Sequence, residues 1–81
     1  MYQIGNDICD ENQIPFAILH PLIAETAQKI ATLSPSQAQT GPAIRNDEKT
    51  IAAHQEFLNN DNQLMIYKIL TQSIQNNGKE L

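Results

Sequence analysis

The sequence predicts an all-α domain of four main helices. Apolar residues recur at three- and four-residue steps, and no stretch shows the two-residue alternation of a half-buried strand. Among its 81 residues the chain has no valine and only four Phe or Tyr residues, so strand-favouring types are scarce. This length gives one domain at most, over residues 1–81, and we expect its independent stability to be modest.

The first helical segment carries Ile4 and Ile8 one turn apart, with Cys9 beside Ile8, and ends near Asn12. The apolar pattern is already running at Met1, and no capping residue precedes it. An isolated helix of about 12 residues is marginal in water unless it packs against something. We interpret this segment as a helix truncated at its N-terminus, which predicts that the natural chain begins earlier.

The second segment runs from about Pro15 to Leu33, and Pro15 suits the first helical turn. Pro21 should kink this helix or restart it, because proline lacks the N–H and its ring clashes with the preceding turn. The polar side is narrow and consists of Glu25, Gln28, Lys29 and Thr32. A helix this apolar needs burial on more than one side, which predicts a homodimer. His20, directly before Pro21, is interpreted as structural.

A loop of about twelve residues follows, from Ser34 to Arg45, with a short helical turn around Ser36 to Gln39. Loops of this length inside helical domains are uncommon and are often functional. Its last part, T-G-P-A-I-R-N-D, leads directly into a helix start. Gly41 allows backbone shapes closed to other residues, and the proline at 42 biases Gly41 toward extended geometry. Asn46 or Asp47 can cap the helix that follows.

This loop combines a permanent cation, Arg45, with free backbone N–H groups at a helix N-terminus, which suits an anionic group on a ligand. The alternative for Arg45 is an ordinary surface pair with Asp47 or Glu48. Thr40 could bond a ligand or its own backbone, and Gly41 with its proline could be turn chemistry alone. The sequence leaves these alternatives open.

The third helix is expected from about Asp47 to Asn59, with acidic residues in its first turn. Asp47, Thr50 and His54 recur at three- and four-residue spacing along one edge of its apolar stripe. Such a row could transfer protons or position a substrate in a cleft. The alternative is a half-buried histidine satisfied by a neighbour, which is the commoner use of histidine.

The fourth helix is expected from about Asn62 to Ile74, after a turn at Asn59–Asp61 in which Asp61 is the N-cap. Asn76–Gly78 should end this helix, and Lys79–Leu81 should form a frayed tail.

Charge and composition exclude several classes of partner. The net charge is −4, and the five basic residues form no stripe, so nucleic acid and anionic membranes are poor partners. No apolar run reaches the roughly 20 residues of a membrane span, and the start lacks signal-peptide features. We therefore expect a cytoplasmic protein. Cys9 is the sole cysteine and is interpreted as core packing, and no cluster has metal-ligand spacing.

The run T-G-P-A-I-R-N-D-E-K-T-I-A-A-H, from Thr40 to His54, resembles the C-terminal helical domain of Rossmann-like NADP oxidoreductases. These proteins are related to pyrroline-5-carboxylate reductase and ketopantoate reductase. The resemblance also covers Ile14 to Thr26 and His54 to Thr71, and therefore nearly the whole chain. One departure is Asn46, where many relatives are expected to have glycine.

The resemblance implies a four-helix domain like the C-terminal dimerisation domain of 6-phosphogluconate dehydrogenase. It implies that Thr40, Gly41, Arg45, Asp47 and His54 face the substrate, with Arg45 or the helix N-terminus holding a substrate anion. It also implies that an N-terminal domain binds NADP, which is outside these 81 residues. The sequence has no G-x-G-x-x-G, so we expect this chain alone neither to bind the cofactor nor to catalyse hydride transfer.

Two alternatives remain from the residues alone. The wide apolar faces could belong to a self-standing helical module that binds another protein, and then the gene would begin near Met1. The same loop could also serve a small anion-binding regulatory domain without catalysis.

Overall fold

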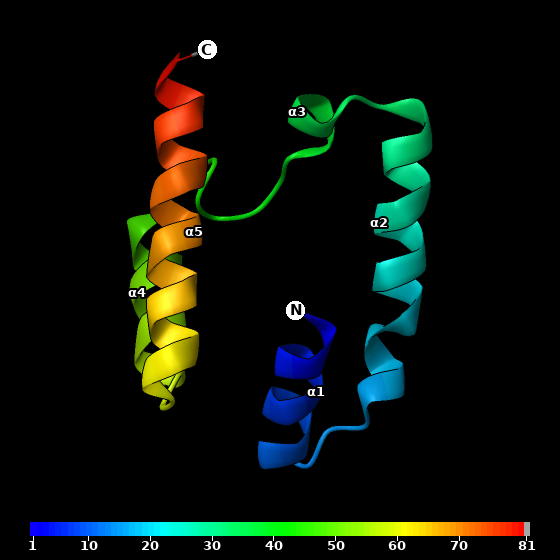
Figure 1. The fold of residues 1–81 in the computed structure, drawn as a ribbon, viewed down its shortest axis with the longest axis vertical. Helices are drawn as coiled ribbons and strands as arrows, with labels where there is room; N and C mark the ends of the chain where they lie inside the picture. Colours follow the sequence, from blue (N-terminus) through cyan, green and yellow to red (C-terminus); the bar gives the residue numbers. More distant parts are fainter. Residues whose placement is uncertain (81) are drawn as a thin grey trace. The chain divides into compact units, whose positions relative to one another are not determined.

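A computed structural model describes residues 1–80, with side chains described through residue 77, and it contains only helices and connecting turns in that range (Figure 1). The elements in chain order are α1 Tyr2–Glu11, the 3-10 helix η1 Phe16–Leu19, α2 His20–Thr32, α3 Pro35–Ala38, α4 Glu48–Phe57 and α5 Asp61–Glu80. The predicted all-α fold is confirmed, since α1, α2, α4 and α5 are its four main helices. None of the helices described is long and apolar enough to cross a membrane.

The chain divides into two compact units, residues 1–38 and the residues from 39 onward. In the first unit, α1 ends at Glu11 with Asn12 as its C-cap, as the predicted end near Asn12 requires. Gln13 then adopts a left-handed conformation with φ 58°. Its N–H donates to Asp10 O at 3.2 Å, and Ile14 N–H donates to Cys9 O at 2.8 Å. These two bonds form the Schellman motif, with glutamine at the position that glycine usually fills.

The helix predicted from Pro15 to Leu33 is interrupted where Pro21 requires it. The chain first makes the tight helix η1, and α2 then begins at His20 with Pro21 in its first turn. The restart is the expected result, because a proline in the first turn leaves no hydrogen bond unmade. Within its unit α2 has no buried residue, and Leu22 is 59% exposed.

The helix α1 passes close to η1 at Gly5. A Cβ placed on Gly5 would lie 3.8 Å from both Leu19 Cδ1 and Phe16 Cε1. Cys9, one turn further along α1, is only 6% exposed, as expected for a packing cysteine.

The short helix α3 lies one residue earlier than the predicted turn. Ser34 and Gln37 hold it by a reciprocal pair of bonds. Gln37 N–H donates to Ser34 Oγ at 3.3 Å, and Ser34 N–H donates to Gln37 Oε1 at 3.1 Å. This is the capping box that an S-x-x-Q sequence allows, and it accounts for a helix start at Pro35.

In the second unit, α4 and α5 form a helical hairpin and lie side by side (Figure 1). The prediction that Asp61 caps the last helix is wrong, because α5 already begins there. Asn60 is the cap instead, and its Oδ1 accepts a hydrogen bond from Gln63 N–H at 3.0 Å.

The predicted end of the last helix at Asn76–Gly78 is also wrong, because α5 continues through these residues to Glu80. Gly costs only about 1 kcal/mol in a helix interior and Asn less, whereas each added turn keeps its backbone bonds. A weak helix former therefore ends a helix only where the chain must also change direction. Lys79 and Glu80 belong to α5, and Leu81 lies outside the described residues.

Candidate functional site

The loop that precedes α4 is a compact turn over residues 42–46. Gly41 enters it with φ 108°, a backbone region that favours glycine. The expectation of an extended Gly41 is therefore wrong, whereas the expectation of a conformation closed to other residues is confirmed. No atom lies within 4 Å of a Cβ built on Gly41, so its backbone angle, and not space, requires glycine there.

Asn46 has a different role from the predicted cap. It adopts φ 55°, in the left-handed region, and its N–H donates to Ala43 O at 3.2 Å. The next N–H, of Asp47, donates to Pro42 O at 2.9 Å. Asparagine is among the few residues that enter this region readily. The position therefore suits glycine or asparagine because of its φ, and Asp47 alone caps α4.

The Asp47 carboxylate satisfies the first turn of α4. It accepts the Thr50 N–H on Oδ1 at 3.1 Å and the Thr50 hydroxyl on Oδ2 at 2.8 Å. These two bonds lower the pKa of Asp47 below its ordinary value, the hydroxyl bond most. Burial opposes them to a smaller extent, and the charges of Arg45 and His54 each lower the pKa by less still. The Asp47 carboxylate of the chain itself therefore already occupies the N-terminus of α4.

Arg45 is only loosely held by this carboxylate. Its Nη2 lies 4.0 Å from Asp47 Oδ2, beyond hydrogen-bond distance, and its side chain is 60% exposed. An exposed pair of this geometry contributes little to stability. The guanidinium therefore keeps its donors for another acceptor.

His54 is paired across the hairpin with a residue that the sequence analysis did not single out. Its Nδ1 lies 2.8 Å from the Tyr67 hydroxyl, and the two rings meet edge to face with centroids 5.7 Å apart. Burial raises the pKa of Tyr67, against a smaller lowering by the Thr71 hydroxyl. The only sequence signal for this partner is that Tyr67 is the one aromatic residue of the fourth helix.

The five predicted site residues fall into three groups. Arg45 and Asp47 lie together, and Thr50 joins them. His54 lies further along α4, within electrostatic reach of Asp47, and is held by its own partner on α5. Thr40 is exposed, and its backbone carbonyl accepts from Gln39 Nε2 at 3.2 Å. Whether these residues and Gly41 contact a ligand stays a prediction.

A separate shallow groove of about 370 Å³ runs between α4 and α5. Apolar atoms form the larger part of its surface, and amides, a hydroxyl, one carboxylate and one ammonium surround the buried Ile51. The groove is lined by Glu48, Ile51, Ala52, Gln55, Lys68, Thr71, Gln72 and Gln75. None of the predicted site residues lines it. Its amides on α5 recur at helical spacing, but such spacing is also typical of any solvated helix face.

The described residues contain neither a metal-binding cluster nor a dinucleotide-binding unit. Within them, no three His, Cys, Asp or Glu side chains come together as a metal site would require. The part of the chain that the structure describes also has no strand leading into a glycine-rich turn, the unit that holds a dinucleotide pyrophosphate.

The fold and the capped loop together define an all-α domain that presents a hydrogen-bonded polar turn at the start of its helical hairpin. The chain belongs to the family described as "Domain of unknown function (DUF2520)", which it matches over residues 1–74.

A solved structure shares this fold closely. It is the crystal structure of a protein from Bacteroides fragilis described as a "putative NADP oxidoreductase", with 40% sequence identity and a TM-score of 0.89. The similarity covers 94% of this chain, which spans 30% of the length of that protein. A search of curated proteins found none that matches. The resemblance to the helical domain of such oxidoreductases is therefore confirmed.

Proposed function

We propose that this chain is the C-terminal, substrate-side and dimerisation domain of an NADP-dependent oxidoreductase, whose cofactor domain lies elsewhere in the same protein. The similarity to the Bacteroides fragilis protein supports this proposal, since that protein is longer than the region shared with this chain. The chain would then contribute residues to a cleft whose other side carries NADP, and would not catalyse alone.

The main support for a substrate-side role is that Arg45 is only loosely paired. Its nearest acid, Asp47, is already engaged by two bonds from Thr50, and the arginine itself is mostly exposed. A guanidinium that retains its donors beside a rigid turn is suited to bind a carboxylate or phosphate group. In the proposed enzyme Arg45 holds the anionic end of the substrate, and His54, two turns beyond Asp47 on the same edge of α4, also faces the substrate.

Replacing Arg45 by alanine in the full-length protein tests this role. Calorimetry would measure the binding of NADP, and of inorganic phosphate and oxalate as probe anions, to the wild type and Arg45→Ala. A charge-assisted bond contributes about 1.5–3 kcal/mol, so we expect at least one probe anion to bind about 10- to 100-fold more weakly. We expect the affinity for NADP to stay unchanged.

Lys49→Ala is the matched control, because it also removes one exposed positive charge from the start of α4. Equal weakening in both variants would indicate a general charge effect. Binding of both probe anions that is unaffected by Arg45→Ala would remove Arg45 from the site.

The dimer is supported by apolar side chains that neither unit covers. In the first unit Ile18 and Leu22 are 65% and 59% exposed, and in the second Met65 and Ile69 are 61% and 62% exposed. Exposed apolar faces of this kind are typical of interfaces. Sedimentation of the full-length protein at micromolar concentration should give the mass of two chains, and a stable monomer would contradict this part of the proposal.

A further inference from the structure

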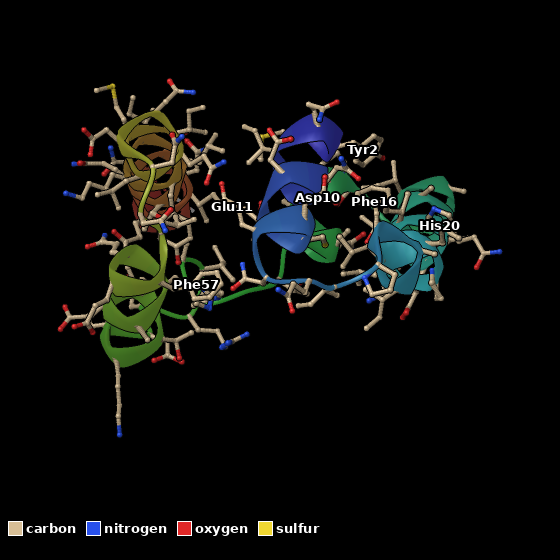
Figure 2. All side chains as sticks on the ribbon, turned by 90° about the horizontal axis from the view of Figure 1, so that it is seen from below. Tyr2, Asp10, Glu11, Phe16, His20 and Phe57 are labelled. Atoms are coloured by element: carbon tan, nitrogen blue, oxygen red, sulfur yellow. The ribbon has the colours of Figure 1, made fainter. Side chains whose placement is uncertain are left out.

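The two histidines of the chain make nearly the same ring contact. His20 meets Phe16 edge to face, with ring centroids 5.7 Å apart and planes at 75° (Figure 2). His54 meets Tyr67 with the same centroid separation and planes at 80°. The difference is the tyrosine hydroxyl, whose oxygen lies 2.8 Å from His54 Nδ1. The chain thus contains its own comparison of a histidine with this hydrogen bond and one without it.

A phenol can bond an imidazole in either protonation state, because its hydroxyl both donates and accepts. When His54 is charged, Nδ1–H donates to the Tyr67 oxygen. When the ring is neutral, Nδ1–H can still donate, or the hydroxyl can turn and donate to a bare Nδ1. A carboxylate or carbonyl partner could only accept, and would lose the bond in the neutral tautomer whose Nδ1 is bare. The hydrogen bond to Tyr67 can therefore persist while the ring gains and loses a proton.

The other ring nitrogen of His54, Nε2, is available to a bound molecule. His54 is exposed, and its Nε2 makes no hydrogen bond within the part of the chain whose side chains are described. On α4 the charge of His54 makes a minor contribution to lowering the pKa of Asp47, and on α5 its hydrogen-bond partner is Tyr67. One nitrogen is thus fixed by the hairpin and the other remains available, as proton exchange with a bound molecule requires.

We propose that Tyr67 is a positioning residue, which holds the His54 imidazole in one orientation so that Nε2 can exchange a proton with the substrate. The inference rests on the proposed function, in which His54 faces the substrate. In the step itself the imidazolium gives its Nε2 proton to the substrate atom that becomes basic. The neutral ring then keeps its proton on Nδ1, bonded to Tyr67, and Nε2 regains a proton from water.

Nitrogen-15 NMR of histidine-labelled full-length protein tests this inference, with ring-to-ring contacts measured by nuclear Overhauser effects during a pH titration. In the wild type we expect the His54 Nδ1 signal of a hydrogen-bonded nitrogen on both sides of the titration, with unchanged contacts to the Tyr67 ring. In Tyr67→Phe we expect a Nδ1 signal like that of His20, while the ring contacts persist, because Phe16 makes the same contact with His20 without a hydroxyl. Tyr2→Phe is the control, because Tyr2 is 68% exposed and makes no hydrogen bond with the described side chains.

One outcome would overturn the inference: a His54 Nδ1 signal that Tyr67→Phe leaves unchanged. These signals need no substrate, so they are independent of the anion-binding result. If the wild type bound neither probe anion, the proposed function would be contradicted. The Tyr67-dependent NMR signals would still test whether Tyr67 positions His54.

Discussion

Thr50 binds the Asp47 carboxylate twice, through its hydroxyl at 2.8 Å and its backbone N–H at 3.1 Å. This pair closes the first turn of α4 and fixes the end of the polar loop relative to the helix. Because the carboxylate is used in this way, the free charge of the loop is that of Arg45. The same relationship makes the stability of the hairpin depend on pH.

The stability of the capped turn should fall in acid. The bonds from Thr50 lower the pKa of Asp47 below its ordinary value of 3.8, so the native state holds the carboxylate ionised more strongly than the unfolded chain does. This contribution is fully present above the ordinary pKa and is lost as the pH falls through the lowered one. Urea unfolding at several pH values should show that the wild type has a larger free energy of unfolding than Asp47→Asn above this pH range, and that the difference shrinks as the pH falls through it. Asp61→Asn is the control, because Asn60 and not Asp61 caps α5. If the free energy of unfolding lost in acid relative to wild type were the same for Asp47→Asn and Asp61→Asn, Asp47 would not be the source of the pH dependence.

Gln13→Gly should stabilise the protein by about 1 kcal/mol. Gln13 holds φ 58° at the end of α1, where glycine avoids the strain that a side chain brings. Gln28→Gly is the matched control, because Gln28 lies exposed inside α2 and glycine there should cost about 1 kcal/mol. Urea unfolding measures both, and a destabilising Gln13→Gly would rule out strain at this position.

The two glycines described at Gly5 and Gly41 should respond in opposite ways to alanine. Gly5 lies in α1, and an added Cβ would make ordinary contacts at 3.8 Å, so Gly5→Ala should stabilise by up to about 1 kcal/mol. Gly41 has open space around it but φ 108°, so Gly41→Ala should destabilise by about 1–2 kcal/mol. Thermal unfolding compares them directly. A neutral Gly41→Ala would mean that the loop can adopt another backbone shape.

Asn60→Ala should cost about 1 kcal/mol of stability, because it removes the acceptor of the Gln63 N–H at the start of α5. Asp61→Ala should cost less, since Asp61 already lies inside the helix. Circular dichroism during urea unfolding measures both variants. A larger loss of stability for Asp61→Ala than for Asn60→Ala would indicate that Asp61 is the cap.

Much of the local structure was predictable because its causes act within a few residues. Pro21 restarts a helix through its own ring, and Gly41 is required by its own φ. The capping box at Ser34 and Gln37 is equally local, and the S-x-x-Q sequence is its signal. The end of α5 was predicted wrongly for a related reason, since weak helix formers bias a helix end without imposing it.

The sequence by itself therefore determined the helical class, the restart at Pro21 and the polar loop that leads into α4. Only the tertiary structure decided that His54 meets Tyr67, thirteen residues away on the facing helix. It also decided that α2 has no buried residue within its unit. The physical reason is one of range: backbone sterics and caps act between near neighbours in sequence, whereas the pairing of two side chains on separate helices depends on how those helices pack.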